Sequence, residues 1–228
     1  MEQSSSDDSQ FHLVDGVIVG NVYDKYATGN PIARRMMAGF LKAVADLYRR
    51  SAPRTVLEVG CGEGLLAQHL LGQEPRPNRF EACDLSIDLV RPDIDRFIKF
   101  RTASVYNLPY DSGEFDLVVC CEVLEHLERP ERAMEELARV TRRGVLISTP
   151  REPLWRILNL LRGRYALQLG NTPGHIQHYN GHSLRRLIES RLRIVAERSP
   201  LPWVVMLAEL DRSQATSAPD CSAIIRPE

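Results

Sequence analysis

The sequence predicts an α/β protein with a doubly wound, mostly parallel sheet of seven strands. Apolar runs of strand length alternate with segments of helical periodicity, as in parallel strands joined by crossover helices. Glycine or acidic residues follow several of these runs, at the strand ends where open sheets of this class bind ligands. At 228 residues, with 43% hydrophobic and 26% charged residues, the chain suits one such domain with elaborations.

The chain before the sheet divides into residues 1–20 and 21–50. The first part includes a run rich in serine and aspartate, and we expect it to be a disordered tail. In the second part Asn30 is suited to cap a helix, Pro31 fits the first helical position, and the apolar residues that follow recur at helical spacing. Residues 21–50 are therefore predicted to form a helical cap.

Residues 51–228 are predicted to form the sheet domain. Five parallel strands are expected near residues 55–60, 79–84, 98–102, 115–121 and 144–149, with helices near 63–71, 87–94 and 130–141. After a further helix that begins near Ser183, the segment Arg193–Glu197 is expected to be a sixth strand. An antiparallel seventh strand is expected at Cys221–Ile225.

Residues 150–180 interrupt the alternation and are predicted to be a lid inserted after the fifth strand. The helix of this lid combines apolar and basic side chains, which are Leu154, Trp155, Ile157, Leu158, Leu160, Leu161, Arg151, Arg156, Arg162 and Arg164. Such a segment can receive a long apolar ligand or rest on a membrane surface as a peripheral contact. Packing against the N-terminal helix is the alternative interpretation.

Composition excludes several classes of protein. No apolar stretch is long enough for a membrane span, and the N-terminus lacks the layout of a secretory signal, so we expect a cytoplasmic protein. The five cysteines have no CxxC spacing and are expected to be reduced, buried thiols. The net charge is −1, but residues 129–198 hold fourteen arginines against six glutamates. This excess indicates either a salt-bridged face or an anionic partner.

A glycine-rich segment, Glu58–Gly64, follows the first strand and opens a helix. Glycines at such a turn let a ligand approach the backbone. The spacing is Gly-x-Gly-x-Gly, and Leu65 stands where a dinucleotide fingerprint has its third glycine. Glu63 at the start of the helix would repel a pyrophosphate. The loop therefore favours a cationic ligand over a nicotinamide dinucleotide.

Four motifs in order resemble the class I S-adenosylmethionine (SAM)-dependent methyltransferases, over roughly residues 22–198. These motifs are Glu58–Gly64, Cys83–Ser86, Leu108–Val118 and Glu122–Leu127. The likeness is to the ubiquinone-biosynthesis O-methyltransferase-like, or methyltransferase type 11, group. The resemblance implies a Rossmann-like fold, SAM as cofactor and transfer of a methyl group.

The resemblance assigns cofactor contacts along the strand ends. The backbone of Gly60, Cys61, Gly62 and Gly64 would pass close to SAM, while Glu58 would order the loop or contact the methionine ammonium. An acid at the end of the second strand accepts hydrogen bonds from ribose hydroxyls in nucleotide folds, so Asp84 is expected to bind the ribose. Leu85 would lie against adenine.

Other cofactor contacts follow from the later motifs. Ser104 stands where the family has an acid that contacts the adenine amine, so the backbone of Val105 is the safer adenine contact. Cys121 and Glu122 would border the methionine part of SAM. By resemblance alone Tyr23, Lys25 and Tyr26 are further cofactor or acceptor contacts, with ordinary packing as the alternative for the two tyrosines.

The segment Glu122–His126 also carries a candidate metal site. Offsets of three and four would place Glu122, Glu125 and His126 on one helical face, where they could hold Mg²⁺ or Mn²⁺. The alternatives are a helix-capping carboxylate and a general base. His175 and His178 follow the lid and are candidates for base, metal ligand or substrate donor. His126 is the first choice for a base because neutral imidazole accepts protons near physiological pH.

The leading hypothesis is methyl transfer from SAM to an oxygen of a small-molecule or lipid-like acceptor. Metal-assisted 2′-O-methylation of RNA is the first alternative, and the same acid and histidine pattern together with the excess of arginine suggests it. A non-catalytic SAM-binding partner subunit is the second alternative. We expect a monomer or a homodimer.

Overall fold

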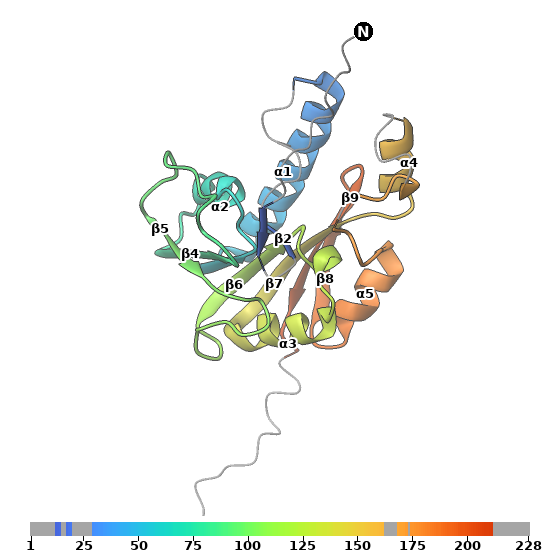
Figure 1. Cartoon of the computed structure of the whole chain (residues 1–228). Coiled ribbons are helices and arrows are strands. Elements are labelled where there is room, and N and C mark those ends of the chain that lie inside the picture. The colour runs from blue at the N-terminus through green and yellow to red at the C-terminus, as the bar shows by residue number, and fades with distance from the viewer. Residues whose placement is uncertain (1–11, 15–16, 20–28, 162–167, 173, 212–228) are drawn as a thin grey trace, which may run out of the picture.

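The computed structural model describes residues 12–14, 17–19, 29–161, 168–172 and 174–211. A sheet of seven strands forms its centre, in the order β5-β4-β3-β6-β7-β9-β8 (Figure 1). These strands are β3 (Thr55–Val59), β4 (Arg79–Asp84), β5 (Ile98–Thr102), β6 (Phe115–Cys121), β7 (Thr141–Pro150), β8 (Arg193–Arg198) and β9 (Trp203–Glu209). Six of these strands run in one direction, and β9 runs opposite to them. The predicted doubly wound, mostly parallel sheet is confirmed.

The strand order reverses direction at β3. From there the chain builds β4 and β5 on one side, then crosses to build β6 and β7 on the other. In open α/β sheets ligands bind beyond the carboxyl ends of the strands at such a switch point. The segments that follow β3, β4 and β6 therefore border the expected site.

Helices cover both faces of the sheet (Figure 1). Helices α1 (Pro31–Ser51) and α2 (Leu65–Leu71) pack on one face, and α3 (Pro130–Val140) and α5 (Gly181–Glu189) pack on the other. The predicted start of α1 is confirmed, because Oδ1 of Asn30 accepts hydrogen bonds from the backbone N–H groups of Ile32 and Ala33. Each helix thus buries one apolar stripe against the sheet.

The expected seventh strand lies elsewhere in the chain. The strand β9 at Trp203–Glu209 occupies this place, and residues 221–225 lie outside the described residues. Six of its seven residues are buried, because β9 is sandwiched between β7 and β8 and covered on both faces. The prediction overlooked a continuous apolar run that is typical of a fully buried strand.

Two other local predictions also differ from the structure. The helix expected near residues 87–94 is replaced by turns, where Pro92 disfavours a helical Arg91 and Oδ1 of Asp95 accepts the Phe97 N–H. Within the expected tail, β1 (His12–Val14) pairs antiparallel with β2 (Val17–Val19). The intervening sequence is Asp-Gly, a common hairpin signal.

Between β7 and α5 the chain forms the segment predicted as a lid. Its helix, α4 (Leu154–Leu161), begins four residues after the carboxyl end of β7. Ile157 and Leu160 on α4 are 48% and 43% exposed. No helix of the described residues is long and apolar enough to cross a membrane.

Several arginines between residues 129 and 198 form ion pairs. Arg142 contacts Asp116, Arg185 contacts Glu197, and Arg191 contacts Glu135. This pattern supports the interpretation of the arginine excess as a salt-bridged face.

Candidate active site

The glycine loop after β3 has a backbone that favours glycine. Gly60, Gly62 and Gly64 adopt φ angles of 80°, 51° and 80°, in the left-handed region. A Cβ on Gly60 would lie 2.2 Å from Cγ2 of Val123, so this glycine also permits close approach of the segment after β6. The loop is tied to β4, because the N–H groups of Gly60 and Cys61 donate to the carbonyl of Cys83.

Asp84 ends β4 beside this loop, as predicted. Its Oδ2 accepts the N–H of Gly62 at 2.7 Å, and its Oδ1 accepts the N–H of Leu85 at 2.7 Å. Burial raises the pKa of Asp84, and backbone hydrogen bonds from Gly62, Leu85 and Ser86 oppose that shift. A carboxylate has about four acceptor positions, so three backbone donors leave room for a ligand. The side chain is therefore oriented by the backbone and can still accept a hydrogen bond from a ligand hydroxyl.

Glu58 lies beneath the loop and is 2% exposed. Burial raises its pKa well above the ordinary value, the nearby Asp84 raises it further, and the Ala67 backbone N–H lowers it. The contact with Ala67 joins Glu58 to the first turn of α2, which fits the predicted loop-ordering role. Two further acidic side chains, those of Glu63 and Asp84, lie on or next to the loop, where carboxylates favour a cationic ligand over a phosphate.

Two of the predicted adenine contacts, Ser104 and Val105, lie after β5. Oγ of Ser104 accepts the N–H of Tyr106 at 3.3 Å, and Ser104 pairs with Asn107 across a tight turn. Val105 in that turn is 8% exposed. Ser104 therefore shapes the turn through its hydroxyl.

Cys121 and Glu122 follow β6. Cys121 is 7% exposed, and burial raises the pKa of its thiol. The thiol is therefore uncharged at neutral pH. Glu122 adopts a φ of 60°, and its two carboxylate oxygens accept from Ser148 Oγ at 3.0 Å and from Trp203 Nε1 at 2.7 Å. Glu122 is thereby directed toward the ends of β7 and β9.

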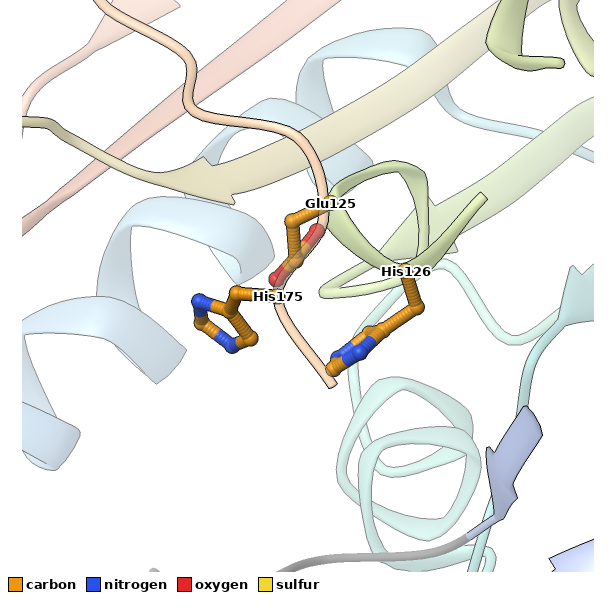
Figure 2. Close-up of side chains that lie close together, drawn as sticks. All are labelled: Glu125, His126 and His175. Atoms are coloured by element: carbon orange, nitrogen blue, oxygen red, sulfur yellow. The ribbon is translucent and has the colours of Figure 1, made fainter. Parts of the chain in front are cut away.

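A group of three side chains, Glu125, His126 and His175, lies beyond β6 (Figure 2). One ligand atom from each can be chosen so that all three lie within 4.8 Å of one another. Glu125 and His126 come from the short 3-10 helix η1 (Leu124–His126), and His175 comes from the segment after α4. The two imidazole rings meet edge to face, with centroids 4.8 Å apart.

Backbone hydrogen bonds bring these distant segments together. The N–H groups of Ile176 and Gln177 both donate to the carbonyl of Glu125 at 2.9 Å, and Nε2 of Gln177 donates to the carbonyl of Leu127. His175 is 8% exposed in this arrangement. The pairing of the two segments therefore positions both histidines.

The contact between His126 and Gly174 indicates which ring nitrogen is protonated. Nδ1 of His126 lies 2.9 Å from the carbonyl oxygen of Gly174. A carbonyl oxygen only accepts hydrogen bonds, so we assign the proton of the neutral ring to Nδ1. Nε2 then keeps a lone pair, which can accept a proton or bind a metal ion.

The predicted metal ligands need one correction. His175 takes the place of Glu122, which is directed to Ser148 and Trp203 and lies outside η1. The three side chains do not share one helical face as expected, because η1 is only three residues long and does not include Glu122. One carboxylate and two imidazoles suit Mn²⁺ better than Mg²⁺, which prefers oxygen ligands.

His178 lies apart from the group of three: its Nδ1 lies 3.9 Å from Oε1 of Glu152, and its side chain is 40% exposed. The predicted contacts Tyr23, Lys25 and Tyr26 lie outside the described residues and stay predictions.

The strand order, the single antiparallel strand and the glycine loop beside an acidic strand end define the class I methyltransferase architecture. A family model for a methyltransferase domain matches residues 31–191. The chain belongs to this family, and the predicted membership of the class I SAM-dependent methyltransferases is confirmed. SAM is the cofactor of this class.

Two curated relatives illustrate the range of similar proteins. The chain is 31% identical over 123 residues to ubiquinone biosynthesis O-methyltransferase of Alkalilimnicola ehrlichii, covering 51% of this chain and 50% of the relative. It is 29% identical over 146 residues to norajmaline N-methyltransferase of Rauvolfia serpentina, covering 60% and 49%. The chain thus spans about half the length of these curated relatives.

Magnesium protoporphyrin IX methyltransferase from Synechocystis PCC 6803, solved with bound S-adenosylhomocysteine (SAH), has a similar fold. The TM-score is 0.60 at 18% identity, over 82% of this chain and 91% of that chain. This likeness supports the fold alone.

Proposed function

We propose that this chain transfers the methyl group of SAM to an oxygen of a small-molecule or lipid-like acceptor. The observation that carries the oxygen assignment is the 2.9 Å contact between Nδ1 of His126 and the carbonyl of Gly174. With the proton on Nδ1, Nε2 of His126 can act as a base. A hydroxyl group needs such a base, because it must lose its proton when it receives the methyl group. The similarity to an O-methyltransferase of ubiquinone biosynthesis supports the same choice.

The residues after β3, β4, β5 and β6 would hold SAM. In this proposal Asp84 binds the ribose hydroxyls, Leu85 and the turn at Ser104 and Val105 border the adenine, and Cys121 borders the methionine part. Glu58 orders the loop whose backbone, at Gly60, Cys61, Gly62 and Gly64, faces the cofactor. Glu122 follows Cys121 at the methionine side of the cofactor, where its carboxylate is held by Ser148 and Trp203.

The chemistry needs few protein groups. SAM supplies a methyl group that is already activated on a sulfonium. The hydroxyl of the acceptor would give its proton to Nε2 of His126 as its oxygen attacks the methyl carbon. The C–O bond would form while the C–S bond breaks and leaves its electron pair on sulfur, so the products would be the methyl ether, SAH and the proton held by His126. The protein mainly aligns the acceptor and excludes water.

A metal-assisted form of the same reaction is the second candidate. Glu125, His126 and His175 would hold the ion, which would lower the pKa of a bound hydroxyl. The contact between Nδ1 and Gly174 also fits this role, because metal-binding histidines commonly donate their other N–H to a carbonyl. Calorimetric titration of the wild type and of the His175→Gln variant with Mn²⁺ tests this candidate. The wild type should bind Mn²⁺ and the variant should not, whereas equal binding by the two proteins would exclude this site.

The exposed apolar face of α4 supports a lipid-like acceptor. Ile157 and Leu160 lie three positions apart, so both project from one side of the helix. That face could contact an apolar acceptor or a membrane surface. We also propose a cytoplasmic location, which the four free, buried thiols of the described residues support.

Transfer of a labelled methyl group tests the proposal. Purified protein is given SAM and matched acceptors: phenols with and without an apolar tail, amines of the same shapes, and short RNA. Label in an ether product of the phenols is expected. Label in amines or RNA alone would contradict the oxygen and small-molecule assignments.

A further inference from the structure

We propose that Trp155, on helix α4, is a positioning residue that holds His175 against His126. Helix α4 would then be part of the acceptor site and not only its cover. The catalytic meaning of this contact rests on the proposed function, but the placement of the rings can be tested without it.

The first argument is the order of the rings. Trp155 and His175 are stacked at an interplanar angle of 24°, with centroids 6.1 Å apart. His175 in turn meets His126 edge to face at 4.8 Å. Both separations lie in the range over which aromatic rings attract each other. The imidazole of His175 thus contacts the indole of Trp155 and the ring of His126.

The second argument is that hydrogen bonds fix the indole of Trp155 to the segment that carries His175. Nε1 of Trp155 donates to Oγ1 of Thr172 at 2.9 Å, and the N–H of His175 donates to the carbonyl of Thr172 at 3.1 Å. Asn159, one turn further along α4, donates to the same hydroxyl at 3.2 Å and to the carbonyl of Gly170 at 2.9 Å. Thr172 and Asn159 are both buried. A shift of α4 would therefore displace His175.

The third argument is that Trp155 also packs against a second aromatic residue, Trp203. Its ring contacts Trp203, with centroids 5.7 Å apart, and Trp203 contacts Phe40 of α1 at 5.0 Å. Nε1 of Trp203 donates to Oε2 of Glu122 at 2.7 Å. Trp203 is 4% exposed. The first residue of β9 thus supports Trp155, and Glu122 holds that residue in turn, which gives Glu122 an indirect part in the site.

Histidine ring resonances test this inference directly. The chain has six histidines, few enough for each ring signal to be assigned with single His→Gln variants. In Trp155→Leu the signals of both His175 and His126 should move, since His175 loses its stacking partner and then shifts against His126. The signal of His182, which lies on α5, should not change. Trp155→Phe should retain most of the wild-type positions, because it keeps an aromatic face.

Two outcomes would overturn the proposal. If the His175 signal alone moves, Trp155 contacts this ring without positioning the pair. If neither signal moves, the stacking is absent in solution. The matched control is Ile157→Ala, on the exposed side of the same helix, which should leave all histidine signals in place.

A second variant covers the case in which Trp155→Leu does not fold. Thr172→Val keeps the side-chain shape but removes the hydroxyl that accepts from Trp155 and Asn159, so the same two signals should move. Unchanged signals in this variant would contradict the proposal. Because these spectra need neither SAM nor an acceptor, a failure here is distinct from a failure of the methyl-transfer assay.

Discussion

The backbone N–H of Gly62 donates a 2.7 Å hydrogen bond to Oδ2 of Asp84. This contact joins the middle of the glycine loop to the end of the neighbouring strand. The carboxylate that we assign to the ribose is therefore held by the same backbone that we assign to the rest of the cofactor.

Asp84→Asn should weaken the binding of SAH. The substitution removes the charge and turns one acceptor into a donor, beside N–H groups that need acceptors. Loss of charge-assisted hydrogen bonds costs about 1.5–3 kcal/mol, or about a ten- to hundred-fold change in Kd. Isothermal titration calorimetry measures this change. The control Asp93→Asn changes an exposed acid and should bind SAH like the wild type; equal losses in both variants would argue for a general charge effect.

Gly60→Ala should destabilise the protein by about 1–3 kcal/mol, because φ is 80° and the new Cβ would meet Val123. Urea denaturation measures the effect. Adding Val123→Ala should restore part of the loss, and Gly181→Ala, with open space around it, should cost little. No rescue by Val123→Ala would mean that the clash is not the cause.

Glu58→Gln should stabilise the folded protein increasingly as the pH rises. The folded-state pKa of Glu58 is raised by burial, so the wild type loses stability as the pH rises from about 4.3, the ordinary value, through that higher pKa. Glutamine does not ionise and avoids this loss. Urea denaturation across a pH series measures the growing difference.

The matched comparison for Glu58 is Glu136→Gln. Its hydrogen bond with Arg139 lowers the pKa of Glu136, so this carboxylate stabilises the protein above its ordinary pKa and loses that effect as the pH falls through the lower folded-state value. Glu136→Gln should therefore be most costly at neutral pH and harmless in acid. Parallel pH profiles for the two variants would contradict both assignments.

His126→Gln should lower the rate of methyl transfer about 10²- to 10⁴-fold, the usual contribution of a general base. The affinity for SAH should stay at the wild-type value, because His126 is assigned to the acceptor. Labelled-methyl transfer and calorimetry measure the two quantities. His182→Gln is the control, and an unchanged rate in His126→Gln would show that another group removes the proton.

The parts of the fold and site that were predicted correctly are encoded locally. The five strands β3 to β7 follow from short apolar runs, and the start of α1 follows from Asn30 and Pro31. Asp84 beside the glycine loop follows from its place at a strand end, since parallel strands end on one edge of the sheet. Each of these features depends on residues that are neighbours in sequence or on a general rule of the fold class.

The parts that could not be predicted depend on distant contacts. The sequence made His175 one candidate ligand among several, and it joins Glu125 and His126 because two backbone N–H groups some fifty residues further along the chain donate to the carbonyl of Glu125. The direction of Glu122 depends on a positive φ and on Trp203. The seventh strand was missed for a simpler reason, because the buried apolar run at Trp203–Glu209 was left unassigned. Backbone pairing between distant loops leaves no periodic signal in the sequence.

A crystal structure of the complex with SAH tests the central claim most directly. The account predicts that both ribose hydroxyls lie within hydrogen-bonding distance of the Asp84 carboxylate, with the rest of SAH against Gly60–Gly64. SAH bound at another place, or ribose hydroxyls without contact to Asp84, would contradict it.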